Sequence, residues 1–182
     1  MNPYIYQFEI VDESGEKPVK RTIELRFDQE NFCHLFGLES IVRRHVRNTG
    51  PYKGQAGWDT IKNGIIDFSD LKVKNKGGFT DNKARFVFFY LVPRLFESPK
   101  GLLFDPDKVS VNTYVDCELL FYDQFQKTYV HIGIMEDINL GYYIPKTFLI
   151  EKMTKQSDGQ KYIKRQQTIH VTKISKEEIE II

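Results

Sequence analysis

Several features that would settle a function at once are missing from this sequence of 182 residues. Only two cysteines occur, Cys33 and Cys117, so disulfide bonds cannot form a framework for the fold. The longest apolar run, residues 86–92, is far shorter than the roughly 20 residues that cross a membrane as a helix. No secretory leader is recognisable, so we expect a protein of the reducing cytoplasm that has no membrane partner.

Signatures of metal and nucleotide sites are also missing. The His and Cys residues lack the spacing of zinc ligands, and the carboxylates do not gather as two-metal sites require. Gly77-Gly78 is too short for a phosphate-binding loop, and there is no G-x-S-x-G sequence of the kind that carries a nucleophilic serine. We therefore expect no metal and no cofactor, and an activity would have to rely on side chains alone.

What the second half of the chain does contain is extended segments. Residues 111–123, 128–136, 142–152 and 160–173 are rich in β-branched and aromatic side chains, and only short turns separate them. Such short connections favour antiparallel hairpins over crossovers. The sequence predicts one α+β domain over residues 1–182, with an antiparallel four-stranded sheet in 102–174, a helical part in 28–97 and an accessory β-hairpin in 1–27.

Alternation along the second segment predicts which sheet face is buried. Val130, Ile132 and Ile134 share one side, whereas His131 lies on the other. We expect the helices to pack on the Val130 face and to leave the His131 face open. An open polar face is either a solvated surface or a site, and the pattern alone leaves both readings open.

The first half of the chain reads as a hairpin followed by helices. Residues 4–11 and 19–27 flank a polar turn, and this hairpin either extends the main sheet or packs beside it. Helix starts are expected at Asp28 and Asn82, with Gly37 ending or bending the first helix and Pro93 interrupting the last. Residues 67–79 read as a linker.

Charge is nearly balanced overall, with a formal net charge of +1, but basic residues are gathered in two blocks. Arg43 and Arg44 lie in the helical part, and Lys161 and Arg165 lie in the last extended segment. Cations interleaved with Tyr and Gln suit a phosphate backbone and its bases. They equally suit a solvated helix face and the protection of a sheet edge, so charge by itself leaves nucleic-acid binding undecided.

Two short motifs, taken in their order, point further. Asn31-Phe-Cys-His-Leu-Phe-Gly37 falls in a predicted helix, and Tyr142-Tyr-Ile-Pro-Lys-Thr-Phe148 falls in the third predicted strand. A helix with F-x-H-L-x-G, followed later by a strand with Tyr, Pro and then Ser or Thr, resembles the phage-associated branch of the Barnase, EndoU, colicin and RelE-like nucleases. That branch occurs in polyvalent proteins and mobile elements.

The resemblance implies an endoribonuclease-like domain that cuts RNA without a metal and that meets a cognate inhibitor protein. His34 matches the helix histidine of the family, Thr147 matches the strand hydroxyl, and Arg85 matches a basic position on the long helix. To these catalytic candidates we add His131. The candidates for substrate binding are Arg43, Arg44, Tyr143, Lys146, Lys161 and Arg165.

The chemistry of RNA is consistent with these residue types. The 2′-OH of RNA is an internal nucleophile, so cleavage by transesterification needs a base, an acid and cations near the phosphate. His is the one side chain that titrates near neutral pH without special tuning. The alternative is a noncatalytic domain of the same shape that binds nucleic acid or a protein.

Overall fold

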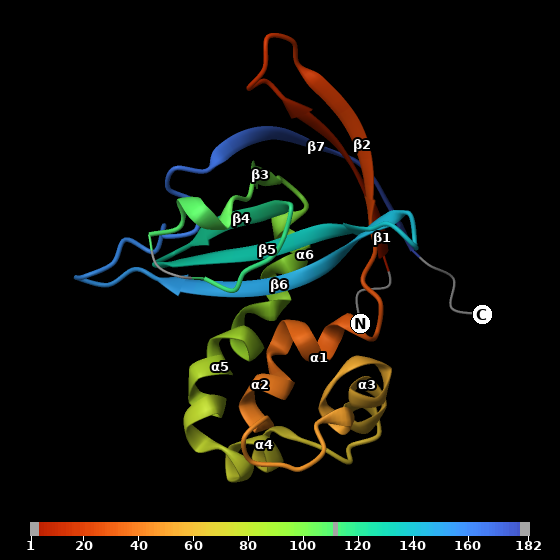
Figure 1. Ribbon diagram of the computed structural model, residues 1–182, viewed down its shortest axis with the longest axis vertical. Coiled ribbons are helices and arrows are strands. Elements are labelled where there is room, and N and C mark those ends of the chain that lie inside the picture. Colours follow the sequence, from red (N-terminus) through yellow and green to blue (C-terminus); the bar gives the residue numbers. More distant parts are fainter. Residues whose placement is uncertain (1–3, 111–112, 179–182) are drawn as a thin grey trace.

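The computed structural model describes residues 4–110 and 113–178 and has an α+β fold (Figure 1). Its strands are β1 (Tyr4–Asp12), β2 (Val19–Leu25), β3 (Lys100–Leu103), β4 (Leu119–Phe125), β5 (Thr128–Asp137), β6 (Tyr142–Lys152) and β7 (Gln167–Glu178). Within the described ranges these seven strands close into a barrel in the order β1-β2-β6-β5-β4-β3-β7. The pairings are antiparallel apart from one parallel bridge between Leu25 and Tyr143. The α+β class is confirmed, but the expected four-stranded antiparallel sheet is wrong.

The N-terminal hairpin belongs to the barrel and is not an accessory. β1 pairs with β2 on one side and with β7 on the other, over residues 4–11. The side chains of Tyr6 and Phe8 are fully buried in the main core. Of the two positions that the sequence left open for this hairpin, the structure has the one that extends the sheet. β7 consequently pairs with β1 and β3, and not with β6 as consecutive hairpins would require.

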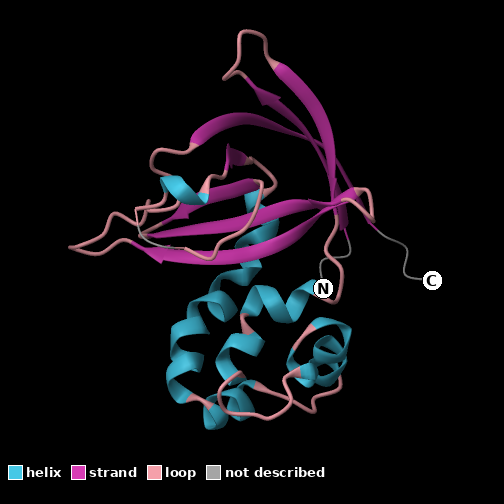
Figure 2. Ribbon diagram, in the orientation of Figure 1, coloured by secondary structure: helices cyan, strands magenta, loops and turns pink. Residues whose placement is uncertain are grey.

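The helices gather on one side of the barrel, alongside β6 (Figure 2). They are α1 (Asn31–Phe36), α2 (Leu38–Val42), α3 (Gly54–Lys62), α4 (Phe68–Lys74), α5 (Lys76–Phe88) and α6 (Val92–Leu95), with 3-10 turns at Gly50–Tyr52, Phe89–Leu91 and Pro106–Lys108. Residues 67–79 are no linker, because Asp67 caps α4 and Asn75 caps α5 through side-chain bonds to backbone N–H groups. None of the helices described here has the length and apolar character needed to span a membrane.

The last helical turns enter the core of the barrel, and Leu35 of α1 also packs in it. Phe96, at the end of α6, lies 4.8 Å from the ring of Tyr6 and 5.8 Å from the ring of Phe121, measured between ring centroids. Helices α1 to α5 also build a second apolar cluster around Leu38, Ile41 and Leu71. The helical part therefore does not lie flat on one face of the sheet. It lies alongside β6, and α6 enters the barrel.

The face that carries His131 is closed, which corrects the expectation that it is open. Val130, Ile132 and Ile134 do point into the main core, but the His131 side chain is also fully buried. Residues 153–166 form turns instead of the start of a strand and carry Tyr162 over this face. Tyr162 contacts the imidazole edge-on, with 5.8 Å between ring centroids. The alternation of side chains within a strand cannot show that a loop from elsewhere in the chain buries one face of that strand.

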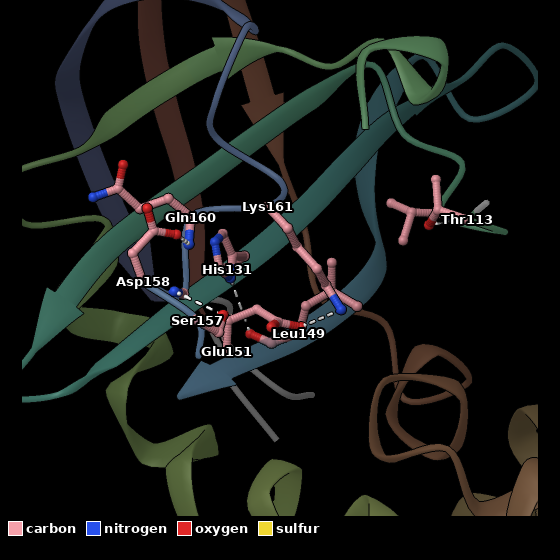
Figure 3. A network of polar contacts seen from close by, with 10 residues as sticks. Thr113, His131, Leu149, Glu151, Ser157, Asp158, Gln160 and Lys161 are labelled. Carbon is pink, nitrogen blue, oxygen red and sulfur yellow. Dashed lines mark hydrogen bonds and ion pairs between the residues drawn. The ribbon is translucent and has the colours of Figure 1, made fainter. Parts of the chain in front are cut away.

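His131 is held in a weakly polar setting (Figure 3). Its Nδ1 lies 3.4 Å from the carbonyl oxygen of Leu149, and its Nε2 has no hydrogen-bond partner among the described residues. Burial, against the opposing effect of the Leu149 bond and with the help of the nearby Lys161 charge, lowers the pKa of His131 to about 4. At neutral pH this imidazole is uncharged and inaccessible, so it cannot meet a substrate.

Burial of His131 predicts a pH-dependent stability. Below the ordinary histidine pKa of 6.5, His131 binds a proton in the unfolded chain, whereas in the folded chain it binds one only near pH 4 and below. Stability is therefore complete above pH 6.5 and falls as the pH drops, by about 2 kcal/mol at pH 5 from this group. In urea titrations at pH 7 and pH 5, His131→Phe should lose that part of the dependence, while His170→Ala, on the exposed side of β7, should keep it. An equal dependence in His131→Phe and wild type would contradict the assignment.

Candidate active site

His34 projects from α1 toward β6. In this helix Cys33, Leu35 and Phe36 are buried, which leaves His34 on the exposed side. Its Nε2 lies 2.7 Å from the backbone carbonyl oxygen of Lys146. Because a carbonyl can only accept, Nε2–H is the donor, and in the neutral ring the lone pair then resides on Nδ1. The imidazole is thus held in a fixed tautomer with Nδ1 able to take a proton.

The Lys146 carbonyl is free to accept this bond because β6 is irregular at that residue. Along the ladder, Gly133 pairs with Thr147 and Ile134 pairs with Pro145, so Lys146 is an extra residue between two paired positions. This is a β-bulge, which leaves one residue out of the ladder and turns the strand locally. Pro145 fits here because it has no N–H to offer to a ladder.

Thr147 lies on the outer face of β6, next to this bulge. A Cβ atom at the opposing Gly133 would come within 2.6 Å of the Thr147 Cγ2 and 2.7 Å of the Cys117 Sγ. Only a glycine at 133 therefore leaves room for the Thr147 methyl group and the Cys117 sulfur in this place. None of the hydrogen bonds between described residues uses the Thr147 hydroxyl, so it is available to a ligand.

Arg85 reaches the same region from α5. Its Nη1 makes a long hydrogen bond of 3.5 Å to the carbonyl oxygen of Leu35. Burial lowers the pKa of Arg85, and none of the ion pairs between described residues involves it. A half-buried guanidinium without a carboxylate partner suits a phosphate, which it can bind through two parallel N–H groups.

Gly37 makes room for this arginine. It ends α1 in the left-handed region, with φ 70°, as the sequence predicted. A Cβ atom there would lie 2.5 Å from the Asn82 Oδ1 and 2.9 Å from the Arg85 Nη1. The glycine of the helix motif thus has two tasks, since it closes the helix and lets the α5 side chains pass.

These residues meet around connected hollows. The smaller one, of about 520 Å³, is lined by His34, Arg85, Thr113, Tyr114, Val115, Asp116, Lys146, Thr147, Leu149 and Tyr162. The larger one, of about 1130 Å³, shares His34, Arg85 and Tyr114 and adds Arg43 and Arg44. The first hollow therefore brings together the histidine, the arginine and the strand hydroxyl that the sequence singled out, and the second continues it along the basic helix.

The comparison with known families fits this arrangement. A family model described as phage-Barnase-EndoU-ColicinE5/D-RelE like nuclease4 matches residues 2–182. The chain belongs to this nuclease family. Searches among curated proteins and among solved structures gave no significant match.

In this family member, not all predicted site residues come together. Tyr143 lies in the barrel core, where its hydroxyl donates to the Glu118 Oε2 over 2.8 Å, and burial raises its pKa. Lys161 forms an ion pair with Glu151 over 2.8 Å (Figure 3). Arg165 is exposed at a turn with φ 67°. None of these three residues lines the two hollows around His34.

Two tyrosines in the smaller hollow were not among the predicted site residues. Tyr114 precedes β4 with its side chain fully exposed, whereas Tyr162 comes from the turns before β7 and is almost buried. Tyr162 is flanked by Lys161 and Lys164, and this pairing of an aromatic residue with cations is the signal that could have marked it. Groups of three or more His, Cys, Asp or Glu placed to hold a metal ion do not occur in the described part of the chain.

The double task of Gly37 can be tested against a matched glycine. Gly141 has a similar φ of 72° but nothing within 4 Å of an added Cβ. Gly37→Ala and Gly141→Ala should both cost about 1 to 2 kcal/mol of stability in urea titrations, for the left-handed backbone alone. Only Gly37→Ala should also weaken the binding of nucleic acid, because its Cβ displaces the Arg85 guanidinium. Equal binding of nucleic acid by the two variants would show that Gly37 does not shape the site.

Proposed function

We propose that this protein is an endoribonuclease that cleaves RNA by transesterification through the 2′-OH, without a metal ion. Family membership supports a nuclease, and the residue types around His34 favour RNA because its internal nucleophile needs only proton transfer and charge stabilisation. The alternative, a noncatalytic domain that binds nucleic acid or a protein, is the outcome expected if the wild type cuts nothing.

One observation carries the proposal: His34, Arg85, Lys146 and Thr147 line a single hollow of about 520 Å³ although they come from α1, α5 and β6. A histidine alone is more often structural than catalytic. Here it stands beside a hydroxyl with no hydrogen bond among the described residues and a guanidinium without an ion pair among them. A protein site that binds and cleaves a phosphate diester needs groups of these kinds.

His34 is the base in this mechanism. Its Nδ1 takes the proton of the 2′-OH while the 2′ oxygen forms a bond to phosphorus, and the bond from phosphorus to the 5′ oxygen breaks. The products are a 2′,3′-cyclic phosphate and a free 5′-OH. The Nε2–H bond to the Lys146 carbonyl keeps the ring oriented.

Thr147, Lys146 and Arg85 bind the reacting phosphate. The Thr147 hydroxyl donates to a nonbridging oxygen, and the Arg85 guanidinium opposes the charge that develops there as phosphorus becomes five-coordinate. In a half-buried site such a cation is screened less than it would be on an open surface. His131 has no part in these steps, because its side chain is fully buried.

Arg43 and Arg44 extend the binding surface beyond the scissile phosphate. Both are exposed in the larger hollow and belong to no ion pair among the described residues. We place neighbouring phosphates of the RNA there. A ribonuclease also endangers the cell that makes it, so we propose that a cognate inhibitor protein binds it. The family description further supports an origin in phages or other mobile elements.

The catalytic assignment predicts a large loss of activity in two variants. His34→Ala and Thr147→Ala should each cleave RNA about 10² to 10⁴ times more slowly than wild type, since each lacks a group that acts in the transition state. Cleavage of a labelled RNA is followed with EDTA present, which also tests independence from metal. His170→Ala, an exposed histidine outside the hollows, is the matched control and should keep full activity.

Circular dichroism establishes that each variant is folded. A wild type inactive both with and without EDTA would favour the noncatalytic alternative. Activity only without EDTA would contradict the metal-independent mechanism, and a folded His34→Ala with full activity would contradict the role of the histidine.

RNA binding should depend on the helical arginines. In a His34→Ala background, the double change Arg43→Glu and Arg44→Glu should lower the salt dependence of RNA affinity by about 0.7 per lost phosphate contact, or about 1.4 together. Arg165→Glu should leave the slope unchanged, because this exposed residue lies outside the hollows. The reverse outcome would place the RNA over the turns before β7, where the sequence pattern of basic and aromatic residues had predicted it.

A further inference from the structure

The proposed cleavage still lacks a proton donor, and this inference rests on that proposed function. As the bond from phosphorus to the 5′ oxygen breaks, the leaving oxygen gains negative charge and needs a proton. His34 cannot supply it in the same step, because it is receiving the proton of the 2′-OH. A second group in the smaller hollow must therefore act as the acid.

Tyr162 is placed for this task. It lines the smaller hollow together with His34 and Arg85, yet its side chain is only 8% exposed. Its ring is held from the other sides by the edge-on contact with His131 at 5.8 Å and by Phe104 at 6.5 Å, both measured between ring centroids. A ring fixed in this way presents its hydroxyl in one position, as proton transfer requires.

We propose that the Tyr162 hydroxyl is the general acid that protonates the leaving 5′ oxygen. In the cleavage step the phenol O–H bond breaks, an O–H bond forms on the 5′ oxygen, and a phenolate remains. His34 meanwhile carries the proton of the 2′-OH. Exchange with water then returns a proton to Tyr162 and removes one from His34, so protons balance over the cycle.

Two cations lie near Tyr162. The Lys161 ammonium lies 4.7 Å from the centre of its ring, and the Arg85 guanidinium lines the same hollow. The pKa of Lys161 is raised overall, because its bond to Glu151 and the negative charge that Tyr162 can carry outweigh the burial that lowers it. The pKa of Arg85 is lowered by burial, and Tyr162 opposes that effect.

Other donors in the hollow are less well held. The Tyr114 side chain is fully exposed and has no ring contact among the described residues, and Asp116 is exposed as well. Lys146 is partly exposed, and four rotatable bonds separate its ammonium from the bulged backbone. Burial and two ring contacts are what distinguish Tyr162.

The test compares two leaving groups. Tyr162→Phe keeps the ring and its packing but removes the proton, so it should cleave ordinary RNA about 10² to 10⁴ times more slowly than wild type. A substrate whose 5′ bridging oxygen is replaced by sulfur leaves as a thiolate, which needs no proton. On that substrate Tyr162→Phe should approach the wild-type rate, whereas His34→Ala should stay slow because the 2′-OH still needs a base.

Tyr122→Phe is the matched control, because Tyr122 also contacts His131, at 6.4 Å between ring centroids, but lies outside the hollows. It should cleave both substrates as wild type does. If the wild type cuts RNA and folded Tyr162→Phe cuts it equally fast, or stays equally slow with the sulfur leaving group, Tyr162 is not the acid. If the wild type cuts neither substrate, the proposed function itself fails.

Discussion

The hydrogen bond from the His34 Nε2–H to the Lys146 carbonyl is the contact on which the candidate site depends. It joins two motifs that are 112 residues apart in the chain. It requires a helix that turns His34 outward and a strand that releases one carbonyl from its ladder, which the bulge at Lys146 provides. A regular β6 would use that carbonyl for pairing and leave the imidazole free to rotate. The irregularity in the strand is thus part of the chemistry.

Two glycines set the space around this bond. Gly37 leaves room for the guanidinium of Arg85, and Gly133 leaves room for the methyl group of Thr147. Each glycine lies across from a site residue without itself offering a functional group. The segment from Phe32 to Gly37 is therefore a geometric unit, in which the glycine leaves room for an arginine that lies far along the chain.

Local chemistry predicted more of this structure than long-range pairing did. The end of α1 at Gly37 and the interruption at Pro93 followed from residue types, whereas His34 and Thr147 were chosen from a family resemblance that left their distance open. Closure of the sheet by the pairing of β1 with β7 could not be predicted in this way. The alternation of side chains in one strand does not show which distant strand it pairs with. The burial of His131 was not predicted for a related reason. The residues that cover it form turns, although their sequence had predicted the start of a strand.

That cover ties the stability of the barrel to the proposed chemistry. β5 is buried on both faces, by the main core on one side and by the cluster around Tyr162 on the other. Its neutral imidazole has little to gain from this position in free energy, because Nε2 remains without a partner among the described residues. A buried ring that holds Tyr162 edge-on, however, fixes a phenol at the wall of the hollow. The unsatisfied nitrogen then lowers the stability of the fold, while the ring that carries it keeps the proposed proton donor in one place.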